Sequence, residues 1–539
     1  MSENLTNTGT AAPSTGGIAR STLIVIGGFA LSMVVGIVKQ RIFSVTFGTA
    51  SAYDAFVAAN AIPELLVNML ASGALAFAFI PIYTDTLQSD DPHESDRLFS
   101  NVFNVLLLLA GIASLIGAIF APTLIRSPWG VAPHFSPEKQ LLTIQLMRTL
   151  LVTTVIFALS SMLTGLLQAR AQFLFPALGP ALYTSGLIFG ATVLTPKLGI
   201  FGLAWGAVVG ALLHFLIHIP GLFIKKIQWY LLVDLASSQL RRVAVLMAPR
   251  IIDLMMAQVT LQWLNTNLAS RMAEGRVAAI QYAYTLMNMP WNLIGVAIGT
   301  VVFPTMAVLA AQADLNAQRK ALSDSLRAVL ALAIPAAAGL ILLGRPIIQI
   351  LYEGGEFTPQ DTELVYFALQ FFALLLISQS MLNVVVPAYA AQKDTLTPLL
   401  VSIFTTAVNI VLAIILSQPL GQGGLAHGGL PLARALAIGL EVTLDLAILH
   451  IRWGGVNTSR ILMDAGKALI ATGAMAAGVL AIRALLHPGA FMMLVLGGGL
   501  GAALYFGVAL AIGIREVRSI PEALIRSLLR RPIAESVPS

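Results

Sequence analysis

Charged residues and cysteines are scarce in this sequence. Only 10% of the 539 residues carry a charge, whereas a soluble globular domain carries roughly a quarter. The absence of cysteine excludes disulfides, thiolate metal sites and cysteine nucleophiles. Because 57% of the residues are hydrophobic, most of the surface must face something other than water. The composition therefore predicts a protein embedded in a lipid bilayer.

Motifs of the common enzyme classes are missing as well. The chain contains no metalloprotease, phosphate-binding-loop or nucleophile-elbow motif. His214 and His218 have the i, i+4 spacing of a metal pair, but no third ligand stands near them, so we interpret them as interfacial histidines. We expect no catalytic residue, no metal site, no enzymatic activity and no nucleic-acid partner.

Long apolar runs define the fold class. A spanning helix needs roughly 20 mainly apolar residues, and about fourteen such runs fit along the chain. They lie near residues 17–40, 52–80, 100–122, 145–168, 172–195, 198–224, 240–268, 278–311, 322–344, 361–391, 396–417, 430–452, 462–485 and 489–514. The sequence therefore predicts an all-α, polytopic membrane protein. The first sixteen residues lack the features of a secretory signal and are expected to form a soluble tail.

A pattern in the second span recurs in the eighth. Gly48 precedes Pro63 by the same interval that separates Gly275 from Pro290. Repeats that lie six spans apart are parallel, an arrangement found in transporters with two rocking lobes.

The distribution of lysine and arginine orients the chain. More of the 31 basic residues fall in connections on the side of the N-terminus than on the other side. Both termini are therefore predicted to be cytoplasmic. The tail Ile520–Arg531 alternates apolar and basic residues at helical spacing, which suits a helix on an anionic inner leaflet. An ordinary positively charged flank is the alternative.

Polar residues inside the spans are the functional candidates, because burying them in a bilayer costs free energy. In the second span Asn60, Glu64, Asn68 and Ser72 recur every fourth residue, beside a kink expected at Pro63. Nothing about a helix midpoint requires a carboxylate such as that of Glu64.

Two further spans present polar residues. The eighth carries four on one helix face: Gln281, Thr285, Asn288 and Asn292. In the seventh, Arg250 and Asp253 are close enough at i, i+3 to form an ion pair. The alternatives are hydrogen bonds between helices for the neutral residues and a purely structural pair for the charged ones.

Three polar positions lie at the predicted helix ends. Lys39 ends the first span, where it either faces a site or reaches the membrane interface. Asp54 opens the second span, where it either serves a site or caps the helix. Thr358–Asp361 places a cap, a first-turn proline and an acid in order and predicts a helix start.

Several segments carry a resemblance to a known family. They are Ser32–Gln40 (SMVVGIVKQ), Phe47–Gly48 with Asp54–Phe56, Ile62–Pro63, Gly73–Ala74 with Ala78–Pro81, Gly295–Pro304 (GVAIGTVVFP), Gly354–Asp361 (GGEFTPQD) and Tyr389–Pro398 (YAAQKDTLTP). The sequence resembles the MurJ (MviN) lipid II flippases of the MOP exporter superfamily. The segments are spread over most of the chain and keep the family's spacing.

The resemblance implies two six-helix lobes followed by two further helices. The expected parts are a cytoplasmic tail at 1–16, lobes at 17–229 and 230–455, the last two helices at 456–514 and a basic cytoplasmic tail at 515–539. It also implies transport of an undecaprenyl-linked peptidoglycan precursor across the bacterial cytoplasmic (inner) membrane by alternating access. A central cavity would hold the diphosphate and sugar, and a groove formed with the last two helices would hold the lipid tail. Membrane lipids and cell-wall synthesis proteins are the implied partners.

The charged cavity of the family is altered here. Uncharged residues or lysine stand where the family carries arginine, or in one case glutamate, at these positions: Met33, Lys39, Val67, Asn68, Thr285 and Asn288. Arginine binds phosphate bidentately, so each loss weakens a diphosphate site. Asp54 is retained.

These observations give a set of expected site residues. Substrate binding is expected at Lys39, Arg250, Asn68, Gln281, Thr285, Asn288 and Asn292, and gating or ion coupling at Asp54, Glu64 and Asp253. No cofactor is expected; a monovalent cation or the membrane potential are the alternatives for driving transport. The other functions left open are export of another polyprenyl-linked glycan or a small molecule, and a non-transporting cell-wall scaffold.

Overall fold

The structure is a computed structural model that describes residues 15–70, 73–87, 89, 91 and 93–514. Over these residues the regular elements are helices, with one isolated bridge between Gly354 and Phe357. Eleven of the described helical segments are long and apolar enough to cross a membrane. The prediction of an all-α, multi-pass membrane protein is confirmed.

The number of spans is not settled by this count. The described residues of the runs predicted at 52–80, 240–268 and 430–452 are helical, but these runs are not among the eleven. Charge is the reason in the last of them, because the helix there contains Arg434, Glu441, Asp445 and Arg452. About fourteen spans therefore stays a prediction.

The chain divides into two compact units. Unit 1 comprises residues 1–46 and 55–259, and unit 2 comprises residues 47–54 and 260–539. This division lies inside the π-helix η2 (Val259–Leu264), and the lobe boundary implied by the resemblance at 229/230 stays a prediction. α10 (Ser238–Gln258) packs against α3 (Gly73–Thr86) and α4 (Glu94–Arg126), which places it in unit 1.

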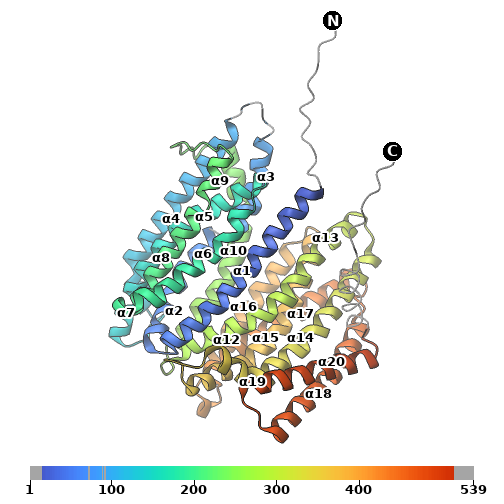
Figure 1. Cartoon of the computed structure of the whole chain (residues 1–539). Helices are drawn as coiled ribbons and strands as arrows, with labels where there is room; N and C mark the ends of the chain where they lie inside the picture. The colour runs from blue at the N-terminus through green and yellow to red at the C-terminus, as the bar shows by residue number, and fades with distance from the viewer. Residues whose placement is uncertain (1–14, 71–72, 88, 90, 92, 515–539) are drawn as a thin grey trace, which may run out of the picture. The chain divides into compact units, whose positions relative to one another are not determined.

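Unit 1 is built on a layer of long helices. Its other elements are α1 (Thr15–Phe47), α2 (Ser51–Leu70), α5 (Pro137–Ala169), α6 (Leu174–Phe189), η1 (Gly190–Leu194), α7 (Thr195–Leu198), α8 (Ile200–Leu216) and α9 (Ile219–Ile224). In Figure 1, α4, α5 and α8 run side by side, and α5 packs against both neighbours. Buried apolar side chains of α3, α4, α5 and α10 form a core that includes Phe79, Leu98, Met162 and Val243.

Unit 2 is arranged around α15 (Pro359–Ala391). Its other elements are α11 (Asn265–Ala269), α12 (Arg276–Trp291), η3 (Asn292–Val296), α13 (Ala297–Ala311), α14 (Leu315–Tyr352), α16 (Leu396–Leu416), η4 (Leu420–Gln422), η5 (Ala426–Gly428), α17 (Gly429–Trp453), α18 (Thr458–Leu486), α19 (Ala490–Met492), η6 (Met493–Gly497) and α20 (Gly498–Ala511). The central helix packs against α12, α13, α14 and α17. α18 and α20, drawn in orange and red in Figure 1, lie side by side and contact α14.

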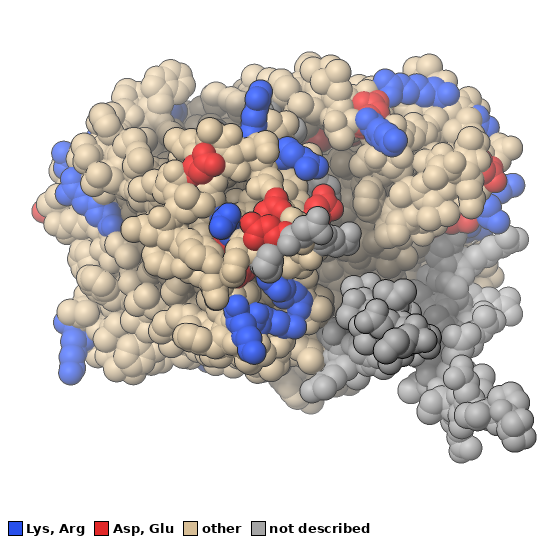
Figure 2. Space-filling view, turned by 90° about the horizontal axis from the view of Figure 1, so that it is seen from above, with Lys and Arg blue, Asp and Glu red and all other residues tan. Residues whose placement is uncertain are grey.

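The surface reflects the scarcity of charge in the sequence. Figure 2 shows scattered blue and red side chains on an otherwise uncharged face. Many large apolar side chains are exposed, among them Leu115, Ile119 and Phe120 of α4. Such a surface is stable only when lipid covers it.

The local features of the predicted repeat are present in both places. Gly48 and Gly275 have positive φ angles of 52° and 80°, which a residue with a side chain adopts at a cost. Pro63 lies inside α2 and Pro290 inside α12. After Pro290 the helix widens into η3, a π-helical turn of the kind that often accompanies functional sites.

Candidate functional site

Lys39, Asn60 and Glu64 form a polar cluster in unit 1. Asn60 Nδ2 donates a hydrogen bond to Glu64 Oε2 (3.0 Å). The ammonium of Lys39 is electrostatically attracted by Glu64 and lies 5.6 Å from the centre of the Phe43 ring. The structure thus brings together a predicted substrate-binding residue on α1 and a predicted gating residue on α2. Asn68 lies one turn further along α2 and is partly buried.

Asp54 caps a helix, but not the one that it begins. One carboxylate oxygen accepts the backbone N–H of Gly275 (2.8 Å) and the other accepts that of Ala278 (2.8 Å), both at the start of α12. The residue is only 1% exposed. A carboxylate at a helix N-terminus satisfies amides that have no partner within the helix. The alternative expected from the sequence was a cap on its own helix, whereas the helix that Asp54 caps begins 221 positions away; its role in gating stays a prediction.

Two of the segments that carry the family resemblance meet beside Asp54. The Thr49 hydroxyl donates a hydrogen bond to Asp361, and the predicted helix start is confirmed as a capping box between Thr358 and Asp361. The two segments also share a buried aromatic cluster, made of Phe47, Tyr53, Tyr282, Tyr352 and Phe357. Its centre is Tyr282, whose ring lies 5.4 Å from Tyr53 and 5.1 Å from Tyr352.

The four polar residues predicted on the eighth span lie on α12 and η3. The Thr285 hydroxyl donates to the backbone carbonyl of Gln281 (2.9 Å), so its own helix satisfies it. The Asn288 side-chain carbonyl is buried and accepts no hydrogen bond from the residues that the structure describes. Asn292 is exposed. Asn288 therefore retains hydrogen-bonding capacity that a ligand or water can use.

One segment of the resemblance, Gly295–Pro304, explains how the helix from α12 to α13 packs on α15. A side chain at Gly295 would place its Cβ 2.9 Å from the Ser380 backbone, and one at Gly299 would lie 2.6 Å from the Asn383 carbonyl. Small residues four apart allow helices in membranes to approach closely. The GVAIG portion of the segment is thus a packing motif.

Other predicted positions lie outside the described residues. These are the side chains of Arg250 and Asp253, residue Ser72 and the basic tail Ile520–Arg531.

A buried acidic face on α17 was missed in the sequence. Arg434, Glu441 and Asp445 are separated by seven and four residues, which places them on one helix face. Asp445 is fully buried, and its two carboxylate oxygens accept no hydrogen bond within the described chain. Glu441 accepts a hydrogen bond from the Thr405 hydroxyl (3.3 Å) and exerts an electrostatic effect on Asp445. The spacing of these residues is visible in the sequence, whereas the burial of Asp445 depends on helices that only the fold brings around it.

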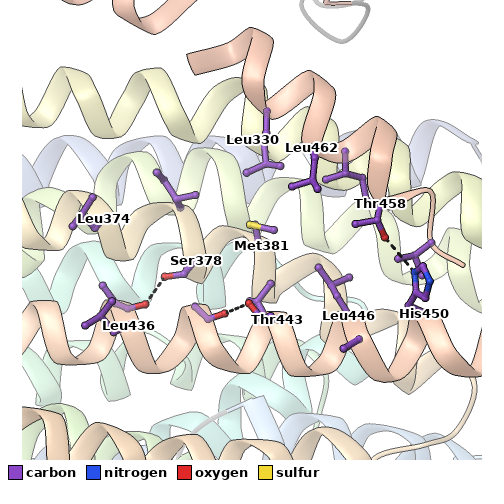
Figure 3. Close-up of a pocket in the computed structure, with 18 of the residues that line it drawn as sticks. Leu330, Leu374, Ser378, Met381, Leu436, Thr443, Leu446, His450, Thr458 and Leu462 are labelled. Carbon is purple, nitrogen blue, oxygen red and sulfur yellow. Dashed lines mark hydrogen bonds between the residues drawn. The ribbon is translucent and has the colours of Figure 1, made fainter. Parts of the chain in front are cut away.

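An apolar cavity of about 850 Å³ lies within unit 2 between α14, α15, α17 and α18. In Figure 3, leucines and Met381 project into it from these helices. Its polar side chains are bonded to the protein: Thr443 donates to the Gly439 carbonyl (2.7 Å), and His450 Nδ1 lies 3.2 Å from the Thr458 hydroxyl. The remaining lining suits an apolar chain rather than a charged ligand.

The Tyr389–Pro398 segment ties three helices of unit 2 together. Asp394 accepts hydrogen bonds from the backbone and hydroxyl of Thr397 (3.0 and 2.7 Å) and pairs with Arg452. The bonds from Thr397 and the Arg452 charge lower the pKa of Asp394 to about 2. The Tyr389 hydroxyl donates a hydrogen bond to the backbone carbonyl of Asp445 (2.7 Å).

His214, in α8, and His218, just after α8, connect this part of unit 1 to α5. His214 contacts the Ser160 hydroxyl, and His218 contacts that of Thr164 (2.9 Å), both on α5. Among the described residues, no group of three metal-ligating side chains is present.

Comparisons with known proteins agree on one family. The family model for lipid II flippase MurJ matches residues 43–498. A lipid II flippase MurJ of Burkholderia cenocepacia is 28% identical over 443 residues, covering 80% of this chain and 83% of the relative. A "probable lipid II flippase MurJ" of Bdellovibrio bacteriovorus is 28% identical over 515 residues, covering 93% and 96%.

Solved structures show the same fold. A lipid II flippase MurJ in an inward closed conformation superposes with a TM-score of 0.75 at 23% identity, covering 94% of this chain and all of that one. An inward-facing multidrug resistance MATE family transporter of the MOP superfamily gives a TM-score of 0.68 at 13% identity, covering 80% and 99%.

Proposed function

Because this chain belongs to the lipid II flippase MurJ family, we propose that it moves a lipid-linked peptidoglycan precursor across the bacterial inner membrane. The observation that carries the proposal is the family match over 43–498, on a chain in which eleven described helical segments are long and apolar enough to cross a membrane. The protein is a transporter rather than an enzyme, working by alternating access with both termini in the cytoplasm. Its partners are the polyprenyl-linked substrate, membrane lipids and cell-wall synthesis proteins.

The head group is assigned to the polar residues predicted from the sequence. Lys39 supplies a cation in unit 1, and Glu64, its electrostatic partner, releases that cation when a diphosphate competes for it. Arg250 supplies a second cation. Asn68, Gln281, Asn288 and Asn292 contribute amides that suit sugar hydroxyls, and Asn288 has an available acceptor.

The lipid tail is assigned to the apolar cavity of unit 2. Its lining comes from α14, α15, α17 and α18, and α18 is the first of the two C-terminal helices. An isoprenoid chain buries apolar surface there without leaving a polar group unpaired.

The driving force is assigned to buried carboxylates. A charged carboxylate inside a bilayer is costly unless a proton or a cation neutralises it. Asp445 beside Glu441 meets this description, and Asp253 is a further candidate from the sequence. Either a monovalent cation or the membrane potential acting on a proton then drives the change of state.

A second candidate is transport of another polyprenyl-linked glycan. The observation that favours it is the replacement of family charges by Thr285 and Asn288 on α12 and by Val67 and Asn68 on α2. A less charged head group needs fewer cations. The polar cluster that Lys39 forms with Glu64 argues against a scaffold without a transport site.

Complementation tests the function. The full chain is expressed in a bacterium depleted of its own lipid II flippase, membrane insertion is verified, and survival and precursor accumulation are followed. Rescue is the expected result. The double variant Lys39→Ala/Arg250→Ala should abolish rescue, whereas Arg41→Ala, an exposed arginine on the same helix as Lys39, should not. Two outcomes would favour transport of another polyprenyl-linked glycan. One is growth while the lipid II precursor still accumulates, and the other is failure to rescue although the wild-type chain is inserted in the membrane.

A further inference from the structure

The connection between α9 and α10 is an extended segment, residues 227–237, that we call the strap. Polar side chains on the first turns of α4 hold its backbone. Asn101 Nδ2 donates to the Asp234 carbonyl (2.8 Å), and its Oδ1 accepts the N–H of the same residue (2.7 Å). Asp96 accepts the N–H of Gln228 (3.1 Å).

Two more residues of α4 complete this attachment. Asn104 Nδ2 donates to the carbonyls of Tyr230 and Leu232 (2.9 and 2.8 Å), and its Oδ1 accepts the indole N–H of Trp229 (3.0 Å). The Ser100 hydroxyl accepts the N–H of Tyr230 (2.9 Å). The strap is therefore held in one register rather than lying loosely over the helix.

The register turns a row of apolar side chains away from the protein. Alternate residues of an extended chain point to opposite sides. Three exposed apolar residues at alternate positions form the outer row: Leu231 (87% exposed), Val233 (46%) and Leu235 (75%), whereas the indole of Trp229 is bonded to α4. Three large apolar residues at this spacing would be costly to leave in water.

The position of the strap along α4 places it at the membrane interface. α4 has 33 residues, or about 50 Å, whereas the hydrocarbon core is about 30 Å thick. Its large exposed hydrophobic residues begin at Leu107, and the attachment of the strap ends at Asn104. The strap thus lies just beyond the apolar part of the helix, at the level of the head groups.

The charges next to the outer row fit anionic lipid. Lys225 and Lys226 precede the strap, and the exposed Arg241 and Arg242 follow it. Basic residues near an inner leaflet are attracted to anionic head groups, and tryptophan is enriched at the interface.

We propose that the strap is a membrane-interface anchor, whose outer row inserts among the lipids while Lys225 and Lys226 contact anionic head groups. The anchor fixes the height of the α9–α10 connection in the bilayer. It does not depend on which substrate the protein carries.

Spin labels test the insertion, because the chain has no cysteine and each introduced one is unique. The variants are Leu231→Cys and Leu235→Cys in the outer row, with Asp234→Cys, an exposed polar position of the strap, as the matched control. The full chain is reconstituted in phosphatidylcholine–phosphatidylglycerol vesicles, and collisions with oxygen and with a water-soluble nickel chelate are measured. We expect oxygen to dominate at 231 and 235 and the nickel chelate to dominate at 234.

Two results would overturn the proposal. Dominance of the nickel chelate at 231 and 235 would place the outer row in water. Protection from both reagents would mean that protein, such as a second copy of this chain, covers it. The labelled control at 234 shows whether the strap keeps its attachment to α4 in each sample.

The head-group contact has its own measurement. Replacing phosphatidylcholine vesicles by vesicles with phosphatidylglycerol should shift the label at 231 deeper. The shift should disappear in a Lys225→Gln/Lys226→Gln background. An equal shift with and without the lysines would contradict the assignment of the head-group contact to them.

Discussion

Asp54 and Asp445 are both almost completely buried, yet their surroundings are opposite. Asp54 is 1% exposed and accepts two backbone N–H groups at the start of α12. Asp445 is 0% exposed, and neither of its carboxylate oxygens accepts a hydrogen bond from the described residues. Burial costs a carboxylate free energy unless partners compensate it. The comparison teaches that hydrogen-bond partners, rather than burial, distinguish the two aspartates, and it predicts that Asp54 stabilises the fold whereas Asp445 serves transport.

The largest loss of stability is expected for Asp54→Ala. The substitution leaves the N–H groups of Gly275 and Ala278 without their acceptor in a buried position. Each such loss costs on the order of 1–3 kcal/mol, so the free energy of unfolding should fall by about 3 kcal/mol. Thermal unfolding in detergent measures this, with Asp54→Asn as the milder variant that keeps one acceptor. An unchanged melting temperature in Asp54→Ala would show that the cap is not needed.

The Lys39–Glu64 pair should show an intermediate effect. The two groups attract each other while Asn60 also bonds to the carboxylate. In a double-mutant cycle with Lys39→Met and Glu64→Gln, the coupling should be about 1 kcal/mol, a size typical of groups in contact. Melting temperatures of the two single variants and the double variant give the coupling. Additive changes would mean that the two side chains act separately.

The comparison also shows which features were visible in the sequence. The capping box at Thr358–Asp361 was predicted correctly because its members are three residues apart and their geometry is local. Asp54 was placed at a helix start, but its partner α12 lies 221 residues away, and only the fold brings them together. The packing of α10 on α3 likewise joins segments that are far apart in the sequence, so only the fold shows it.

The candidate site was predictable only in part. The spacing of Asn60 and Glu64 was legible, and the structure bonds the two side chains. That Lys39 of another helix joins them could not be inferred from periodicity. The acidic face of α17 had the required spacing, but whether Asp445 is satisfied depends on its neighbours from other helices.

A buried histidine extends the comparison to pH. The His427 Nε2 lies 2.9 Å from the Leu364 carbonyl, and its Nδ1 lies 3.2 Å from the Arg276 guanidinium. Burial lowers the pKa of His427 to about 4, and the nearby Arg276 adds to this. The unfolded chain, with an ordinary histidine pKa near 6.5, binds the proton more readily. Stability should therefore be complete above about pH 6.5 and fall as the pH drops toward 4.

The contribution of His427 is separable from that of the carboxylates. His427→Gln keeps a donor for the Leu364 carbonyl but cannot take up a proton. Its melting temperature should match that of the wild type at pH 7 and decline less between pH 6.5 and 4. A parallel decline in both proteins would mean that groups other than His427 cause the loss of stability in acid. Asp394 is not one of them, because its pKa is lowered to about 2 and it titrates below this pH range.

The smallest change in stability is expected for Asp445→Asn, and this variant tests the comparison most directly. The carboxylate has no hydrogen bond to lose in the described chain, and removing its charge relieves the electrostatic effect of Glu441. The free energy of unfolding should therefore stay the same or rise, whereas complementation should fail if this carboxylate carries the coupling proton or cation. Glu441→Gln is the matched control on the same face of α17, where the Thr405 hydroxyl already bonds to the carboxylate. If Asp445→Asn lowered the melting temperature as far as Asp54→Ala, Asp445 would be structural, and the absence of partners would not mark a functional aspartate in this protein.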